Sequence, residues 1–216
     1  MNSILRVHLN PTPDQEARLV ALQTAFAEVC NAIAPTVQQT RCWNRVALHH
    51  LVYHRLRERF PLLGSQMVCN AIYSVSRTCR LVLQHPSSPF NVAKRPGAPL
   101  PLLTFATTAP VYFDRHTLSL KDGRLSMYTL DGRMRFQLDL KPEDQARFHA
   151  EKLQEIVLWR HANGFQLAFT FMPEEPAAKA RSAEAFAEEP SSGEFPEYLI
   201  VTPGTPQTVP ELGEVA

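Results

Sequence analysis

The stretch I-L-R-V-H-L-N-P-T-P-D-Q, residues 4–15, sets the organisation of the chain. Its first half, residues 4–9, has the partial alternation of a short β-strand. Its second half starts a helix: Thr12 is a good N-cap, Pro13 suits the first helical position, and the T-x-x-Q spacing completes a capping box. A single short strand is not stable alone, so it needs partners from later in the chain.

Three helices are predicted after this strand from the spacing of apolar residues. The first begins at Pro13 and ends at Pro35, because a proline disfavours helix in the residue before it. The second covers residues 46–60 and the third residues 65–84. The expected buried positions are Val46, Leu48, Leu51, Val52 and Leu56 on the second helix, and Met67, Ala71, Ile72, Val75, Cys79 and Val82 on the third.

Strands are predicted to dominate the next part of the chain. Residues 86–110 form a proline-rich connector with one strand near residues 102–106. Asp-Gly pairs then separate short alternating segments, which is the pattern of β-hairpins. A short helix and a further hairpin with Asn-Gly at its turn follow. The expected segments are strands 117–120, 124–129 and 133–138, helix 142–150, and strands 153–159 and 165–171.

These elements predict an α+β fold. The first strand has partners only among the later ones, so the helices interrupt a small antiparallel β-barrel of wedge or OB-like type. The barrel comprises residues 1–10 and 100–172, and a helical lobe of about three helices comprises residues 11–99. Residues 173–216 hold seven prolines and nine glutamates. Such a composition favours a disordered acidic tail.

The net charge of +1 conceals a strong asymmetry. Residues 31–113 carry nine cations and one acid, Glu58, for a net charge of +8. Residues 173–216 carry nine glutamates against two cations, for a net charge of −7. Ordinary surfaces intersperse both signs, so the basic middle favours a protein that binds nucleic acid.

The third helix carries the main candidate binding face. Gln66, Asn70, Tyr73, Ser74, Arg77, Arg80 and Gln84 recur every three to four residues, opposite the apolar stripe. Amides and arginines suit base edges and phosphates, and tyrosine suits stacking. A plain solvated face is the alternative, although such faces usually carry Glu–Lys pairs. The other candidate contacts are Arg41, Trp43, Asn44, Arg45, Arg55 and Arg59, where Trp43 suits either base stacking or the core.

Neither catalysis nor a bound cofactor is predicted. The chain has no glycine-rich phosphate loop, and no aspartate follows Asp144. His50 and His54 have metal-ligand spacing but no completing acid or cysteine. The four cysteines lack C-x-x-C spacing and are expected to be free thiols, buried at Cys69 and Cys79. Without a membrane span or a secretory leader, the expected location is the cytoplasm.

Several motifs, in order, resemble the TnpB family of insertion-sequence proteins, whose members are usually called transposases. They are V-H-L-N-P-T-P-D-Q-E-A-R-L (7–19), C-N-A-I (30–33), V-A-L-H-H-L-V-Y (46–53), R-E-R-F (57–60), S-Q-M-V (65–68), T-L-D-G-R (129–133) and the hairpin 156–171. The resemblance covers residues 1–172. It rests on the order and spacing of the motifs, since each alone is weak.

The resemblance implies a wedge-type barrel interrupted by a helical recognition lobe. In that family the two units hold a guide RNA and read a short motif beside the DNA target, as in miniature type V CRISPR effectors. It assigns motif reading to Gln66 and Asn70, to Asn44 or Trp43, and to the connector residues Thr104, Thr107 and Thr108. A RuvC-like nuclease domain and a zinc ribbon follow in the family. Here the Pro/Glu-rich segment begins at Pro173 instead, so cleavage is expected to be absent.

Three functions remain open from the sequence. The first is a binder of guide RNA and target-adjacent double-stranded DNA without chemistry. The second is one half of a split RNA-guided endonuclease that a separate RuvC-like subunit completes. The third is a DNA-only transcriptional regulator built from the helices.

Overall fold

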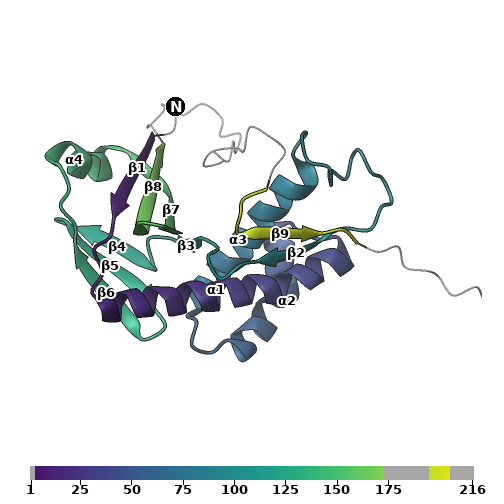
Figure 1. Cartoon of the computed structure of the whole chain (residues 1–216), viewed down its shortest axis with the longest axis horizontal. Coiled ribbons are helices and arrows are strands. Elements are labelled where there is room, and N and C mark those ends of the chain that lie inside the picture. Colours follow the sequence, from purple (N-terminus) through teal and green to yellow (C-terminus); the bar gives the residue numbers. More distant parts are fainter. Residues whose placement is uncertain (1–2, 173–194, 205–216) are drawn as a thin grey trace, which may run out of the picture.

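The computed structural model describes residues 3–172 and 195–204 as a mixed α+β fold. Its helices are α1 (Pro13–Thr40), α2 (Arg45–Arg59), α3 (Ser65–Gln84) and α4 (Pro142–Ala150). Its strands are β1 (Ser3–His8), β2 (Leu102–Phe105), β3 (Val111–Phe113), β4 (Leu118–Lys121), β5 (Arg124–Thr129), β6 (Gly132–Gln137), β7 (Lys152–His161), β8 (Gly164–Met172) and β9 (Leu199–Thr202). The long α1 runs from the sheets at one end of the molecule to the other helices (Figure 1).

The first strand pairs with a late one, as the sequence predicts. β1 lies antiparallel to β8, with Ser3 opposite Phe171 and His8 opposite Gln166. The order of this sheet is β1-β8-β7-β3. The three long helices are therefore inserted in the chain between β1 and its pairing partner β8.

The predicted hairpins are also confirmed. β4, β5 and β6 form a three-stranded antiparallel sheet. Asp122 and Gly123 make the first turn with φ of 50° and 73°, the left-handed pair that a two-residue hairpin loop requires. Gly164, with φ of 105°, follows the turn between β7 and β8.

The predicted barrel is not closed. In the described residues the strands form three separate antiparallel sheets, and β2 pairs with β9 rather than with the other strands. A groove of about 500 Å³ opens between the edge strands β1 and β6, with Leu5, Val7 and Phe136 among its lining residues.

The first helix passes through the predicted stop at Pro35 and ends at Thr40. Packing explains the difference. Ala34 and Val37 on either side of the proline are buried. One turn earlier, the Asn31 side chain donates to the carbonyl of Phe105 and accepts from its N–H, at 2.9 and 2.7 Å. These contacts tie α1 to β2 and outweigh the cost of a proline in a helix.

The prediction that the whole acidic segment is disordered is wrong for residues 195–204. Leu199–Thr202 form β9, antiparallel to β2, and Leu199 is 6% exposed. Tyr198 packs edge-on against Trp159, and Phe195 lies 6.0 Å from Phe90 between ring centroids. Residues 173–194 and 205–216 lie outside the described residues.

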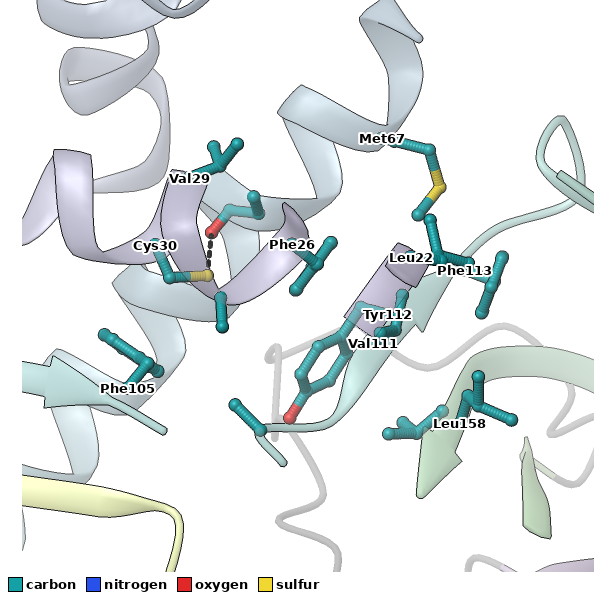
Figure 2. Close-up of a cluster of buried hydrophobic side chains, with 14 of the residues drawn as sticks. Leu22, Phe26, Val29, Cys30, Met67, Phe105, Val111, Tyr112, Phe113 and Leu158 are labelled. Atoms are coloured by element: carbon teal, nitrogen blue, oxygen red, sulfur yellow. Dashed lines mark hydrogen bonds between the residues drawn. The ribbon is translucent and has the colours of Figure 1, made fainter. Parts of the chain in front are cut away.

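One continuous hydrophobic core joins the helices to the sheets. Figure 2 shows Leu22 and Phe26 of α1 meeting Met67 of α3 and Phe113 of β3. The predicted stripe of α3 is buried throughout, from Met67 to Val82. On α2 two predicted core positions are exposed instead, Val46 at 65% and Leu51 at 50%, because only one side of that helix meets its neighbours.

Helix α1 is long and apolar enough to cross a membrane by length and composition alone. Half of its most apolar window is buried inside the protein, and its apolar side chains belong to the common core. The core helix of a soluble protein has the same properties.

Candidate nucleic-acid interface

The polar face of α3 is an internal contact rather than an open surface. Asn70 is 5% exposed, and its side chain lies 3.5 Å from Thr117 Oγ1. The Gln66 amide donates to the carboxylate of Asp114. Ser74 on the same face is also buried. This face therefore packs against the strands that follow the connector.

Glu155 of β7 anchors the middle of the same face. It forms an ion pair with Arg77, whose side chain is 12% exposed, while that of Glu155 is 8% exposed. It also accepts a hydrogen bond from Tyr73 Oη at 2.9 Å. Burial and the Glu155 charge together raise the pKa of Tyr73 to about 12. Two of the residues predicted to contact nucleic acid are thus engaged by one carboxylate.

The start of α2 also uses its candidate residues structurally. Asn44 caps the helix, and its side-chain oxygen accepts from the N–H groups of Val46 and Ala47 at 3.0 and 3.2 Å. Trp43 is half-buried against the core. The guanidinium of the exposed Arg45 stacks over the Tyr73 ring at 5.1 Å.

Three other candidate arginines of the helical part are exposed and contact neutral groups. Arg41 donates to the carbonyl of Ala98 at 2.9 Å, and Arg55 donates to Thr36 Oγ1 at 2.9 Å. Arg59 lies over the ring of Phe60 at 5.2 Å. No ion pair joins these cations, or Arg45, to a carboxylate within residues 3–172 and 195–204. We call Arg41, Arg45, Arg55 and Arg59 the helical arginine set.

The last candidates lie apart from this set. Arg80 is half-buried on α3. Thr104 is half-buried in β2, opposite Ile200 of β9. Thr107 and Thr108 are exposed, and the Thr108 carbonyl accepts from Gln23 Nε2 at 3.0 Å. The structure therefore does not bring all the predicted contacts onto one surface.

Asp114 and two of the cysteines have structural roles. Asp114 accepts from the N–H groups of His116 and Thr117 at 3.0 Å. Cys30 and Cys79 are buried free thiols, and burial raises the pKa of both, that of Cys79 to about 12. Cys69 is only half-buried. Where the chain is described, no group of three or more His, Cys, Asp or Glu residues is placed to hold a metal ion.

Sequence reasoning missed a second group of exposed cations, on the β4–β5–β6 sheet. Lys121, Arg124, Arg133 and Arg135 all point away from the core. The signal was present, because strict alternation in 124–129 and 133–137 places every second residue on the solvent side. The prediction rested only on the uninterrupted basic run of residues 31–113.

No family model and no curated protein matches the chain in comparisons of the sequence with known proteins. The assignment of function therefore rests on the residues and their geometry.

Proposed function

We propose that the chain is a nucleic-acid-binding protein of TnpB type, which holds an RNA and target-adjacent double-stranded DNA without cutting either. The observation that carries this proposal is the exposed positive charge of the helical arginine set. Its four members are exposed and lack carboxylate partners among the described residues. Exposed cations without counter-charges attract phosphates and release the counterions condensed on them.

The order of elements supports the TnpB-type assignment. The resemblance implies a first strand, then inserted helices, then later strands that complete its sheet. Here β1 precedes three long helices, and β8 pairs back onto it. In this proposal the sheets β1-β8-β7-β3 and β4-β5-β6 make up the wedge-like unit, which stays open at the groove between β1 and β6. We place such a protein in the cytoplasm.

The absence of cleavage is also part of the proposal. Two-metal phosphodiester chemistry needs converging carboxylates, and residues 145–216 contain no aspartate. Asp114 is engaged in its own turn, and Asp131 pairs with Arg18 at 3.6 Å. We expect purified protein with Mg²⁺ or Mn²⁺ to leave DNA intact. Metal-dependent cutting that an Asp114→Asn variant abolishes would contradict this part.

The test measures nucleic-acid binding by the full chain with two kinds of α2 variant. One removes positive charge from the helix and the other removes negative charge. Replacing Arg55 and Arg59 by glutamine should reduce the slope of log K against log salt by about 2, or about 1 per lost phosphate contact. Glu58→Gln removes the only acid of residues 31–113 and should strengthen binding. Sequencing of the nucleic acid that co-purifies identifies the RNA. If neither variant changes the slope, the proposal is wrong; co-purification of DNA alone would favour a DNA-only regulator.

A further inference from the structure

The solvent side of the β4–β5–β6 sheet has an unusual charge pattern. The residues on that side are Ser119 and Lys121 of β4, Arg124, Ser126 and Tyr128 of β5, and Arg133, Arg135 and Gln137 of β6. Four of the eight are cations and none is an acid. We call Lys121, Arg124, Arg133 and Arg135 the basic sheet face.

The opposite side of this sheet is apolar and buried, so the cations cannot turn inward. Leu125 and Met127 are fully buried, and Met134 is 3% exposed. A one-residue slip in register would bury the arginines and expose these side chains. The core therefore fixes the basic sheet face toward solvent.

Like charges meet directly within the basic sheet face. Lys121 is the register partner of Arg124 across the β4–β5 hairpin, and like charges at directly opposed positions destabilise a sheet. Arg135 is the partner of Ser126, one step diagonally from Arg124. The carboxylates of the adjoining turns, Asp122 and Asp131, do not relieve this repulsion by ion pairs with the four cations.

The spacing of the cations suits a chain of phosphates. Arg133 and Arg135 are two residues apart on β6, or about 6.8 Å along a strand, and Arg124 on the neighbouring strand is diagonal to Arg135, at about 7–8 Å. Arg133 is held in place, because its guanidinium donates to the carbonyls of His116 and Ser126 at 2.8 and 3.3 Å. An array anchored at Arg133 on an open sheet fits a backbone lying across it.

We propose that the basic sheet face binds the sugar–phosphate backbone of RNA. The choice of RNA rests on Ser119 and Ser126, which are register partners and lie between the cations. Their hydroxyls both donate and accept hydrogen bonds, as contact with a ribose 2′-OH requires. The surface is a shallow sheet without a projecting helix, which fits the wide, shallow minor groove of A-form RNA. This inference rests on the proposed function and assigns its RNA partner to a surface distinct from the helical arginine set.

The basic sheet face touches the start of α3 through Tyr128. The ring of Tyr128, at the edge of the basic sheet face, lies against Gly64 at the start of α3: a Cβ added to that glycine would be 3.1 Å from Tyr128 Cε1. Arg57 of α2 donates to the carbonyl of Leu63, next to this contact.

The experiment compares three double variants of the full chain on an RNA hairpin and a DNA hairpin of the same sequence, at several salt concentrations. They are Arg124→Gln with Arg135→Gln, Arg55→Gln with Arg59→Gln, and a charge-matched control, Lys141→Gln with Lys152→Gln. Arg124, Arg135, Lys141 and Lys152 are all exposed, so folding should be unchanged, and thermal melting checks this.

The Arg124→Gln, Arg135→Gln variant should reduce the slope of log K against log salt by about 2 for RNA and leave that slope unchanged for DNA. Its loss of RNA affinity should be larger than that of the control variant. Equal losses on RNA and DNA would overturn the assignment to RNA. An unchanged RNA slope, with a reduced slope in the Arg55 and Arg59 variant, would overturn the sheet surface and leave the proposed function standing. Failure of the wild-type chain to bind either hairpin would overturn both.

Discussion

The polar face of α3 and the solvent side of the β4–β5–β6 sheet have similar residue types but opposite electrostatic outcomes. On α3, Arg77 and Tyr73 meet Glu155, and Gln66 meets Asp114. On the sheet, Arg124 and Lys121 face each other with no acid between them. An arginine on a polar face of a helix or sheet is therefore available to a phosphate only if no carboxylate from a distant segment of the chain forms an ion pair with it.

The largest effect should come from breaking the buried pair. Glu155→Leu leaves the charge of Arg77 without its carboxylate and should destabilise the protein by about 3–5 kcal/mol, measured by urea unfolding. The exposed counterpart is Glu143, whose pairing with Lys141 at 3.9 Å is solvent-exposed; Glu143→Gln should cost less than about 1 kcal/mol.

A second variant isolates the cause of that loss. Replacing both partners, Arg77→Met with Glu155→Leu, should recover much of the stability, since a buried pair is often replaceable by apolar residues. If the double variant is as unstable as Glu155→Leu alone, then the loss comes from packing rather than from an uncompensated charge.

The next largest effect concerns β9, where the adjacent residues Leu199 and Ile200 allow a buried and an exposed position to be compared. Leu199 is 6% exposed and Ile200 is 58% exposed. Leu199→Ala should cost about 2–3 kcal/mol, whereas Ile200→Ala should change stability by less than about 0.5 kcal/mol. Deleting residues 176–216, which include β9, should cost at least as much as Leu199→Ala. Equal, small effects of the two substitutions would show that β9 does not pack on β2 in solution.

The strands and helices were largely predictable because their signals are local. The Thr12 capping box and the Asp122-Gly123 turn depend on residues within a few positions of each other. The elements that the sequence did not predict depend on contacts between residues far apart in the chain. The helix continues past Pro35 because Asn31 holds Phe105, and β9 forms inside a Pro/Glu-rich segment because β2 offers an edge. Strand β3, with all three residues buried, shows no alternation to detect.

The candidate site was harder to predict than the fold. The sequence of residues 65–84 does not predict that Arg77 pairs with Glu155, which lies 78 positions later in the chain. By contrast, the basic sheet face follows from alternation alone once the inward apolar residues, such as Leu125 and Met134, are recognised. Exposure was predictable in the sheet, where every second residue faces out, and not on a helix that proved to be covered on more than one side.

Alkaline pH should weaken the contacts around α3 before those of the sheet. Burial, aided at Tyr73 by the charge of Glu155, raises the pKa of Tyr73 and Tyr198 to about 12, above their ordinary value of about 10. The unfolded chain therefore releases these protons first. The stabilisation is complete below pH 10 and is lost as the pH rises toward 12. The midpoint of urea unfolding should fall from pH 9 to 10.5 to 11.5. In the Tyr198→Phe variant the midpoint should fall less steeply over the same pH range. A flat profile for the wild type would contradict this.

The smallest effect is expected for Asn70, the residue whose predicted role was base reading. Because it is buried against Thr117, Asn70→Ala should cost about 1 kcal/mol of stability and leave discrimination among duplexes that differ beside the target unchanged. Binding to a small duplex library measures this. A loss of discrimination of about 1–3 kcal/mol, the value of a bidentate base contact, would show that Asn70 contacts DNA bases and contradict this prediction.

Chemical modification of arginines, with and without bound RNA, tests the central claim most directly. The claim is that the helical arginine set and the basic sheet face contact nucleic acid and that the α3 face does not. A guanidinium-specific reagent read out by mass spectrometry should modify Arg55, Arg59, Arg124 and Arg135 in the free protein and spare Arg77. RNA should then protect Arg124 and Arg135. Reaction at Arg77 in the free protein, with protection by RNA, would contradict the account.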